Sequence, residues 1–343
     1  MKIWIDLTSL PHIHFFRALI RRLEKAGYDV LVTSREFSLM NDILEKNGIE
    51  YTSIGSHGGI DRKNKLIKSS ERVSELAKFI SREKPDFGMS KHSAECPRVC
   101  FGLGIPCMTV IDHETAEAAM RLMVPLSDFI ISPAATPARV LKEFGARDIL
   151  QFYGVCEPAH FYDFSPNDSV IKDLGLSRDD RILIARSEPM LSSHNGYESK
   201  LLSVLKDIRK NFPGIQTVFI PRSQEDLAKF KDLDLIIPKA SIDTLSLYSF
   251  ASLMIGAGSC MNREACIGGC PAISICPDNL PGVDKFLISE HVMWHSLKKD
   301  EIVKIASDIL DDKIDLETNG KVLKKFEDPY GKIMEIINRM NVS

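Results

Sequence analysis

The chain alternates short apolar runs rich in β-branched residues with longer amphipathic stretches, from Lys2–Asp6 at one end to Gly331–Arg339 at the other. Short apolar runs of this kind predict strands that are buried on both faces, and the amphipathic stretches predict helices that cover them. Strands that alternate with helices form parallel sheets, because each helix returns the chain to the end of the sheet at which the previous strand began. The pattern therefore predicts an α/β fold with parallel sheets.

Apolar composition and flanking turn residues give the bounds of the expected elements. The expected strands are Lys2–Asp6, Tyr28–Ser34, Glu50–Ile54, Asp86–Ser90, Pro106–Ile111, Asp128–Ser132, Gln151–Phe152, Arg181–Ala185, Gln216–Ile220, Leu235–Ile237, Leu253–Ile255 and Ala272–Ile275. The expected helices are Ile13–Ala26, Ser38–Asn47, Lys65–Glu83, Cys96–Leu103, Tyr197–Phe212, Asp226–Phe230, Thr244–Ala251, Asn262–Ile267, Leu280–Ser289, Lys299–Leu310 and Gly331–Arg339, with two more starting near Glu114 and at Ala134–Pro137.

The length of 343 residues suits two α/β domains of about 150–170 residues each. Phe161–Leu174 is a polar segment with Pro166 and Asn167, and we expect it to link them. The expected division is residues 1–160, residues 161–325, and a C-terminal helix in 326–343 that packs back on the first domain. Two open sheets that face each other would bring their carboxyl-end loops to a common cleft.

Charge and hydropathy restrict the partners. The 44 basic and 47 acidic residues give a net charge of -3, which predicts no affinity for nucleic acid. The N-terminal apolar run is too short for a signal peptide, and no segment has the roughly 20 apolar residues of a membrane span, so we expect a cytoplasmic protein. The basic residues Lys63, Lys65, Lys68 and Arg72 predict a solvated helix face, with a weak peripheral membrane contact as the alternative.

The cysteines form no C-x-x-C pair. They are Cys96, Cys100, Cys107, Cys156, Cys260, Cys266, Cys270 and Cys276. Their apolar surroundings predict buried, reduced thiols rather than metal ligands, so we expect neither a zinc site nor any other bound metal.

The sharpest local pattern is the glycine-rich segment from Leu253 to Pro271. Gly256 and Gly258 allow a tight turn and a close approach to a ligand, and Ser259 follows them. A helix after such a turn points unpaired N–H groups at the ligand, which predicts a phosphate site. Glu264 on that helix is placed to accept the hydroxyls of a ribose, with a solvated glutamate as the alternative.

Polar residues also follow other expected strands. His12 at the end of the first strand is a candidate general base, because an imidazole titrates near neutral pH. Arg186 and Arg222 close two strands of the second domain and suit bidentate contacts with a diphosphate, with surface ion pairs as the alternative.

Two further groups belong to the expected first domain. His113 and Glu114 are alternative candidates for the base, although Asp112 before them also fits a helix N-cap. His57 and Gly58 form a loop that could cover an acceptor, and His92 follows another strand toward the same edge.

These motifs together resemble a known superfamily. Gly256–Pro271, with its pattern G-x-G-S-x-x-x-x-E-A-x-x-x-G-x-P, is similar to the nucleotide-binding element of GT-B proteins such as MurG-like glycosyltransferases and UDP-N-acetylglucosamine 2-epimerases. The N-terminal W-I-D-L-T-S-L-P-H element, the G-S-H-G-G loop and D-H-E resemble an uncharacterised GT-B-like family known mainly from archaea. The resemblance implies two Rossmann-like domains, a diphosphate on the glycine turn and a ribose on Glu264. Simple epimerase chemistry is disfavoured because His92 stands where an acidic turn is expected, and Arg186 lies in the run that replaces the epimerase histidine motif.

The expected function is a GT-B-type glycosyltransferase that uses a nucleoside-diphosphate sugar, most simply a UDP-sugar, and an acceptor of unknown identity. The alternatives are a UDP-sugar 2-epimerase or hydrolase, and a non-catalytic nucleotide-sugar-binding protein. We expect no separate cofactor, and either a monomer or a homodimer.

Overall fold

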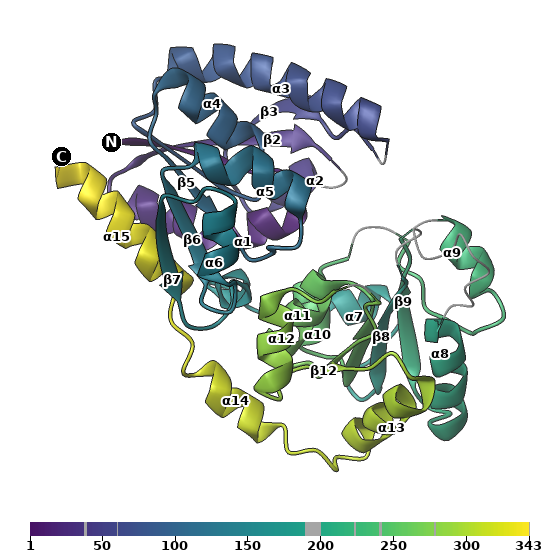
Figure 1. Ribbon diagram of the computed structural model, residues 1–343. Helices are drawn as coiled ribbons and strands as arrows, with labels where there is room; N and C mark the ends of the chain where they lie inside the picture. The colour runs from purple at the N-terminus through teal and green to yellow at the C-terminus, as the bar shows by residue number, and fades with distance from the viewer. Residues whose placement is uncertain are drawn as a thin grey trace. The chain divides into compact units, whose positions relative to one another are not determined.

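The computed structural model describes residues 1–37, 40–59, 61–188, 200–222, 224–239, 242–277 and 279–342, and these residues form two compact units (Figure 1). Unit 1 consists of Met1–Tyr162, Pro281–Val283 and Phe326–Ser343, and unit 2 of Asp163–Leu280 and Asp284–Lys325. Each unit has its own parallel sheet.

The sheet of unit 1 has seven strands in the order β3-β2-β1-β4-β5-β6-β7. Their bounds are β1 Lys2–Asp6, β2 Asp29–Glu36, β3 Thr52–Ser56, β4 Phe87–Lys91, β5 Cys107–Val110, β6 Phe129–Pro133 and β7 Asp148–Phe152. The chain builds outward from β1 to β3 on one side and then from β4 to β7 on the other. The strand order therefore reverses between β1 and β4, the position at which open α/β sheets bind ligands.

Helices cover both faces of this sheet. They are α1 Leu10–Lys25, α2 Met40–Lys46, α3 Arg62–Glu83, α4 Glu95–Leu103, α5 Glu117–Met123, α6 Ala138–Glu143 and α15 Pro329–Val342, with short 3-10 turns η1 Val124–Leu126 and η2 Glu157–Phe161. Successive side chains of a strand point to opposite faces. Ile3 and Ile5 accordingly pack with α1, α2 and α15, whereas Trp4 packs with α3 and α4.

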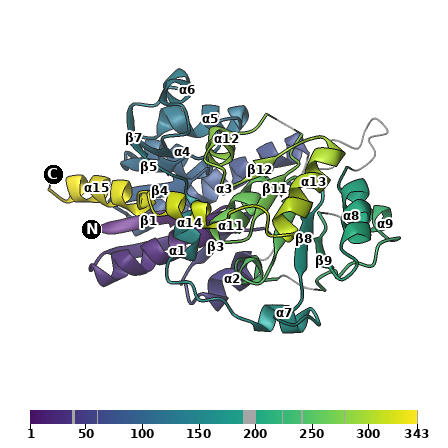
Figure 2. The same cartoon turned by 90° about the horizontal axis from the view of Figure 1, so that it is seen from below.

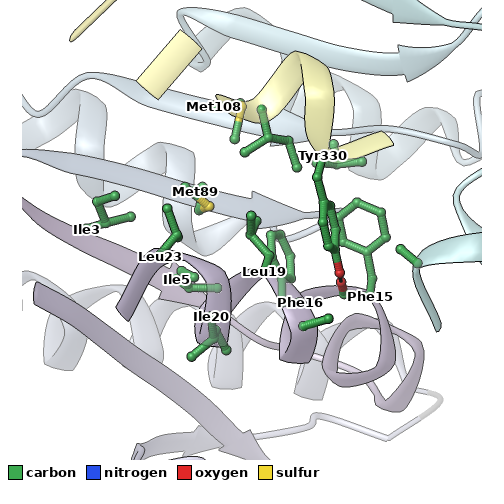
Figure 3. Close-up of a cluster of buried hydrophobic side chains, with 14 of the residues drawn as sticks. Ile3, Ile5, Phe15, Phe16, Leu19, Ile20, Leu23, Met89, Met108 and Tyr330 are labelled. Carbon is green, nitrogen blue, oxygen red and sulfur yellow. Dashed lines mark hydrogen bonds between the residues drawn. The ribbon is translucent and has the colours of Figure 1, made fainter. Parts of the chain in front are cut away.

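The C-terminal helix α15 completes the core of unit 1. Tyr330 is buried, its ring lies 5.7 Å from that of Phe15, and its hydroxyl donates a hydrogen bond to the Phe15 carbonyl (Figure 3). Ile333, Ile336 and Ile337 join the same apolar cluster. The last helix is thus part of the first sheet's packing, although all of unit 2 precedes it in the sequence.

The sheet of unit 2 has the order β12-β11-β10-β8-β9, with β8 Ile182–Arg186, β9 Gln216–Ile220, β10 Leu253–Gly256, β11 Ala272–Ser274 and β12 Trp294–His295. Its helices are α7 Ser169–Asp173, α8 Lys200–Asn211, α9 Gln224–Lys229, α10 Thr244–Tyr248, α11 Ser259–Ile267, α12 Gly282–Ser289, α13 Lys299–Leu310 and α14 Glu317–Leu323, and the first two residues of α12 belong to unit 1. Helices α8 and α13 lie side by side over one face (Figure 2). Here the strand order reverses between β8 and β10.

Several sequence-based bounds need correction. Leu235–Ile237 is not a strand and contributes an isolated bridge between Val218 and Ile236. The expected linker Phe161–Leu174 contains α7, and the expected helix starts at Ile13, Glu114 and Asn262 move to Leu10, Glu117 and Ser259. The short helix expected from Ala134–Pro137 begins only at Ala138. The expected starts Ser38 and Tyr197 lie outside the described residues. Strand β12 and helix α14 were not expected.

Among the described residues, no helix combines the length and apolar character needed to cross a bilayer.

Candidate functional site

The glycine turn of unit 2 connects β10 to α11 at the point where the strand order reverses. Gly258 is the N-cap of α11 and offers no side-chain cap, so the N–H groups of the first turn have no acceptor within the helix. A Cβ on Gly256 would lie 2.8 Å from Met254 Cε, 2.9 Å from Asn262 Oδ1 and 3.1 Å from Arg186 Cβ. Packing therefore requires glycine at this position, independently of any ligand.

Two arginines flank this turn. Arg186 ends β8 and donates from Nη1 to the carbonyls of Ile220 and Pro221, at 3.2 and 2.8 Å. Arg222 donates from Nε to the Ser187 carbonyl at 2.9 Å, and a Cβ on Gly258 would lie 3.0 Å from its Nη2. Both arginine side chains thus lie beside the glycine turn and are held there by backbone carbonyls, whereas their contact with a diphosphate stays a prediction.

Ser259 belongs to a buried ionic group that the sequence did not indicate. Its hydroxyl lies 2.7 and 2.8 Å from the two oxygens of Asp284 on α12, and Arg263 Nη1 donates to Asp284 Oδ1 at 2.8 Å. Both charged side chains are buried. The Ser259 hydroxyl therefore fixes the first turn of α11, and a ligand would meet the backbone N–H groups there.

Glu264 lies on α11, five residues after Ser259, and is 4% exposed. Burial and the charge of Glu264 raise the pKa of Tyr248, which is also buried, well above its usual value. A solvated glutamate is therefore the wrong alternative for this position. The role of Glu264 in binding a ribose stays a prediction.

In unit 1 the carboxyl ends of β4 and β5 carry a buried ion pair. Lys91 Nζ pairs with Asp112 Oδ2, and both side chains are 5% exposed. Burial alone would lower the pKa of Lys91, but the Asp112 carboxylate raises it above its usual value. His92, with a left-handed φ of 47°, places Nε2 3.1 Å from Asp112 Oδ1. Asp112 thus pairs with Lys91 and is not the helix cap considered from the sequence, because α5 starts at Glu117.

His12 lies in the first turn of α1 and is 7% exposed. Burial, then the charges of Lys91 and His92, lower its pKa well below 6.5, so the ring is neutral at neutral pH. The Thr8 backbone N–H donates to Nδ1 at 3.3 Å. Because an N–H group can only donate, the neutral ring carries its hydrogen on Nε2. In this tautomer His12 can donate a hydrogen bond from Nε2, and its expected role as a general base stays a prediction.

The other two candidate bases also belong to unit 1. The ring of His113 lies 6.4 Å from that of His92, and its Nε2 is 3.0 Å from the Thr115 hydroxyl. Glu114 Oε1 accepts a 2.7 Å hydrogen bond from Gly282 N. Its Oε2 is buried and has no hydrogen-bond partner among the described residues, which leaves an acceptor atom open.

The G-S-H-G-G loop has a structural explanation for two of its glycines. Gly55 has a φ of 72° at a bulge in β3, and a Cβ there would lie 2.9 Å from Arg72 Cγ. A Cβ on Gly58 would lie 2.5 Å from the Lys65 Cα, so Gly58 allows α3 to approach the loop. His57 accepts a hydrogen bond from Gly59 N at 3.1 Å and packs on Phe37.

Arg72 is buried, so the expectation that it belongs to a solvated face of α3 is wrong. Its side chain is 1% exposed and donates to both oxygens of Asp6, at 2.6 and 3.1 Å, while Glu95 lies 3.7 Å away. Burial alone would raise the pKa of Asp6, but Arg72 and the hydroxyls of Thr33 and Ser93 lower it below its usual value. Lys63 and Lys65 are exposed, as expected.

The cysteines are only partly as expected. The Sγ atoms of Cys96, Cys100 and Cys107 lie within 4.8 Å of one another in an apolar cluster with Trp4. Cys260, in the first turn of α11, is exposed, and Cys276 is half-buried. The expectation of buried thiols is therefore wrong for these two residues.

The units thus define a two-domain α/β protein with polar sites at the strand-order reversals of both sheets. The chain belongs to the family described as "Protein of unknown function (DUF354)", which matches residues 1–341. An uncharacterized protein of Methanocaldococcus jannaschii is 39% identical over 315 residues, covering 90% of this chain and 92% of the relative. The sequence-based resemblance to this uncharacterised family is confirmed.

The chain is also similar to a transferase over part of its length and to an epimerase in fold. A Clostridium botulinum UDP-N-acetylglucosamine--N-acetylmuramyl-(pentapeptide) pyrophosphoryl-undecaprenol N-acetylglucosamine transferase is 33% identical over 119 residues, 32% of this chain and 33% of the transferase. The structure of Methanocaldococcus jannaschii UDP-GlcNAc 2-epimerase in complex with UDP-GlcNAc and UDP matches with a TM-score of 0.73 and 17% identity, over 99% of this chain and all of the epimerase. The predicted GT-B-like fold with parallel sheets is confirmed.

Proposed function

We propose that the protein is a glycosyltransferase that takes the sugar of a nucleoside diphosphate, most simply a UDP-sugar, to an acceptor hydroxyl. One observation carries the proposal. Arg186 and Arg222 flank the uncapped start of α11 at the strand-order reversal of unit 2. This arrangement supplies two guanidinium groups and a helix N-terminus to one small region, which suits a diphosphate.

The same groups fit the chemistry of transfer. When the bond between the sugar and the diphosphate breaks, negative charge develops on the leaving oxygen. Donors that are already in position stabilise that charge without rearrangement, and carbonyl contacts hold both arginines. The N-terminus of α11 and the guanidinium groups of Arg186 and Arg222 would stabilise the charge on the leaving diphosphate.

Unit 1 would supply the acceptor side. His12 would donate from Nε2 to an oxygen of the sugar or acceptor, because Nδ1 accepts the Thr8 N–H. The base would then be Glu114, whose Oε2 has no hydrogen-bond partner among the described residues, or His113. A positioned general base typically contributes about 10²–10⁴-fold to the rate.

A UDP-sugar 2-epimerase or hydrolase is the second candidate. The Lys91–Asp112 pair, with His92 against the same carboxylate, gathers acid–base groups at the strand-order reversal of unit 1. Paired groups of this kind are what proton transfer at a sugar carbon requires.

Two measurements on the full chain test the proposal. In a thermal-shift screen against UDP-, GDP-, TDP- and CMP-sugars, we expect stabilisation that grows with the concentration of a UDP-sugar. The stabilising sugar nucleotide is then incubated without acceptor, and we expect it to remain intact. Conversion to its C2 epimer, or hydrolysis, would replace the transferase by the second candidate. Absence of stabilisation by every sugar nucleotide would contradict both.

A further inference from the structure

Arg35, near the end of β2, is held in place but not neutralised. Its Nε donates to the Thr8 carbonyl at 3.0 Å. Its two terminal nitrogens have no hydrogen-bond or ion-pair partner in any part of the chain that the structure describes. A guanidinium fixed through Nε presents its other N–H groups as a preorganised fork, the geometry that binds phosphate or carboxylate.

The nearby carboxylates are already occupied. Asp6 and Glu95 are the acidic groups whose charges act on Arg35. Arg72 donates to both oxygens of Asp6 and lies 3.7 Å from Glu95, and the hydroxyls of Ser93 and Ser69 donate to these carboxylates as well. The carboxylates of Asp6 and Glu95 are therefore already paired with Arg72 and nearby hydroxyls, and Arg35 is an additional cation beside them.

Two aromatic rings lie beside this cation. The Arg35 guanidinium carbon is 5.6 Å from the centre of the Phe37 ring, and the His57 ring is 4.3 Å from the same ring. Phe37 is 37% exposed, so this face is accessible. We name Arg35, Phe37 and His57 the Arg35 cluster. It combines a fixed cation with an exposed apolar surface.

Thr8 connects the cluster to His12. The Thr8 carbonyl accepts from Arg35, while its N–H and hydroxyl lie 3.3 and 3.2 Å from His12 Nδ1. A molecule with its negative group on Arg35 would therefore extend along the β1–α1 loop toward His12. Burial is the main cause that lowers the pKa of His12 and of His57, and the charge of Arg35 lowers both further, which places this charge within electrostatic range of both rings.

We propose that the Arg35 cluster binds a phosphate or carboxylate group of the acceptor, so that the acceptor substrates of this protein are anions. That the bound anion is an acceptor substrate rests on the proposed function, whereas anion binding by the Arg35 cluster can be tested independently. It assigns Arg35 to substrate selection, while the sequence offered only His57 and Gly58 in this region.

The test uses the full chain with UDP at saturation, so that the glycine turn of unit 2 is occupied. Inorganic phosphate and succinate are titrated separately by calorimetry, as probes of the two classes of anion. We expect one of them to bind, with at least about tenfold weaker binding in Arg35→Gln, from the loss of one charge-assisted contact. Arg35→Lys keeps the positive charge but loses the forked N–H geometry, so its anion affinity should lie between those of the unchanged protein and Arg35→Gln.

Arg98→Gln is the matched control, because Arg98 is an exposed arginine of the same unit on α4. Circular dichroism and the urea midpoint show whether each variant folds. Equal anion affinity in Arg35→Gln and in the unchanged protein would overturn the proposal, as would absence of binding by both probes. If UDP itself fails to bind, the proposed function falls, but the comparison of Arg35→Gln with Arg98→Gln still decides the anion site.

Discussion

Replacing Asp6 by alanine is expected to lower the free energy of unfolding of unit 1 by about 3–5 kcal/mol, because it leaves the buried Arg72 cation without its main counter-charge. Asp6 is fully buried, and it accepts two hydrogen bonds from Arg72 and one each from Thr33 and Ser93. Urea unfolding, followed by tryptophan fluorescence in a Trp294→Phe background so that the signal comes from Trp4 in unit 1, measures the loss.

Lys68→Ala on α3, the helix that carries Arg72, is the control. Lys68 pairs with Glu71 at 2.9 Å, with side-chain exposures of 45% and 51%. Exposed pairs of this kind typically contribute about 0.2–1 kcal/mol. If Asp6→Ala costs no more than Lys68→Ala, the buried pair does not stabilise unit 1 as described.

The Asp6–Arg72 pair also sets an acid dependence. The folded pKa of Asp6 lies below its ordinary value of 3.8. The stabilisation is therefore fully present above pH 3.8 and is lost as the pH falls through the folded pKa. Asp6→Asn, which cannot titrate, should reduce the loss of stability over this acid range.

Arg222→Gln is expected to weaken UDP binding by about 10- to 150-fold, which corresponds to the roughly 1.5–3 kcal/mol of a hydrogen bond to a charged group. The Ser187 carbonyl orients the Arg222 side chain beside Gly258, so the cation is in place before the nucleotide arrives. Isothermal titration of the full chain with UDP gives the dissociation constant.

Arg178→Gln is the matched control for Arg222. Arg178 belongs to the same unit, is 69% exposed and pairs with Asp168 at 3.3 Å. Its replacement should leave UDP affinity unchanged. Similar affinities for the two variants would mean that Arg222 does not contact the diphosphate.

The sequence predicted the sheets and helices well because their signals are local. A buried parallel strand is a short apolar run, and Gln216–Ile220 and Lys299–Leu310 have the same bounds in the structure as in the prediction. Leu235–Ile237 has the same apolar composition but pairs only through Ile236. Whether an apolar run becomes a strand depends on neighbours that are distant in the sequence, and composition does not encode them.

The candidate sites were predictable only in part for the same reason. Gly256, Gly258 and the arginines at strand ends are visible because parallel strands place their carboxyl ends at one edge. The partners of Arg72 and Ser259 lie 66 and 25 residues away, in Asp6 and Asp284, and helical periodicity carries no information about them. The role of His12 likewise depends on a backbone N–H of Thr8, which every non-proline residue has.

If unit 2 binds the diphosphate of a nucleotide at the first turn of α11, as we propose, bound UDP should shield Cys260 in that turn. Cys260 is exposed, so its alkylation rate can be followed in the folded protein. The measurement is the rate of Cys260 alkylation by iodoacetamide, read by mass spectrometry with and without UDP. We expect UDP to slow alkylation of Cys260 in a concentration-dependent way, and Arg222→Gln to shift this protection to higher UDP concentrations. An unchanged rate at Cys260 with UDP at millimolar concentration would contradict it.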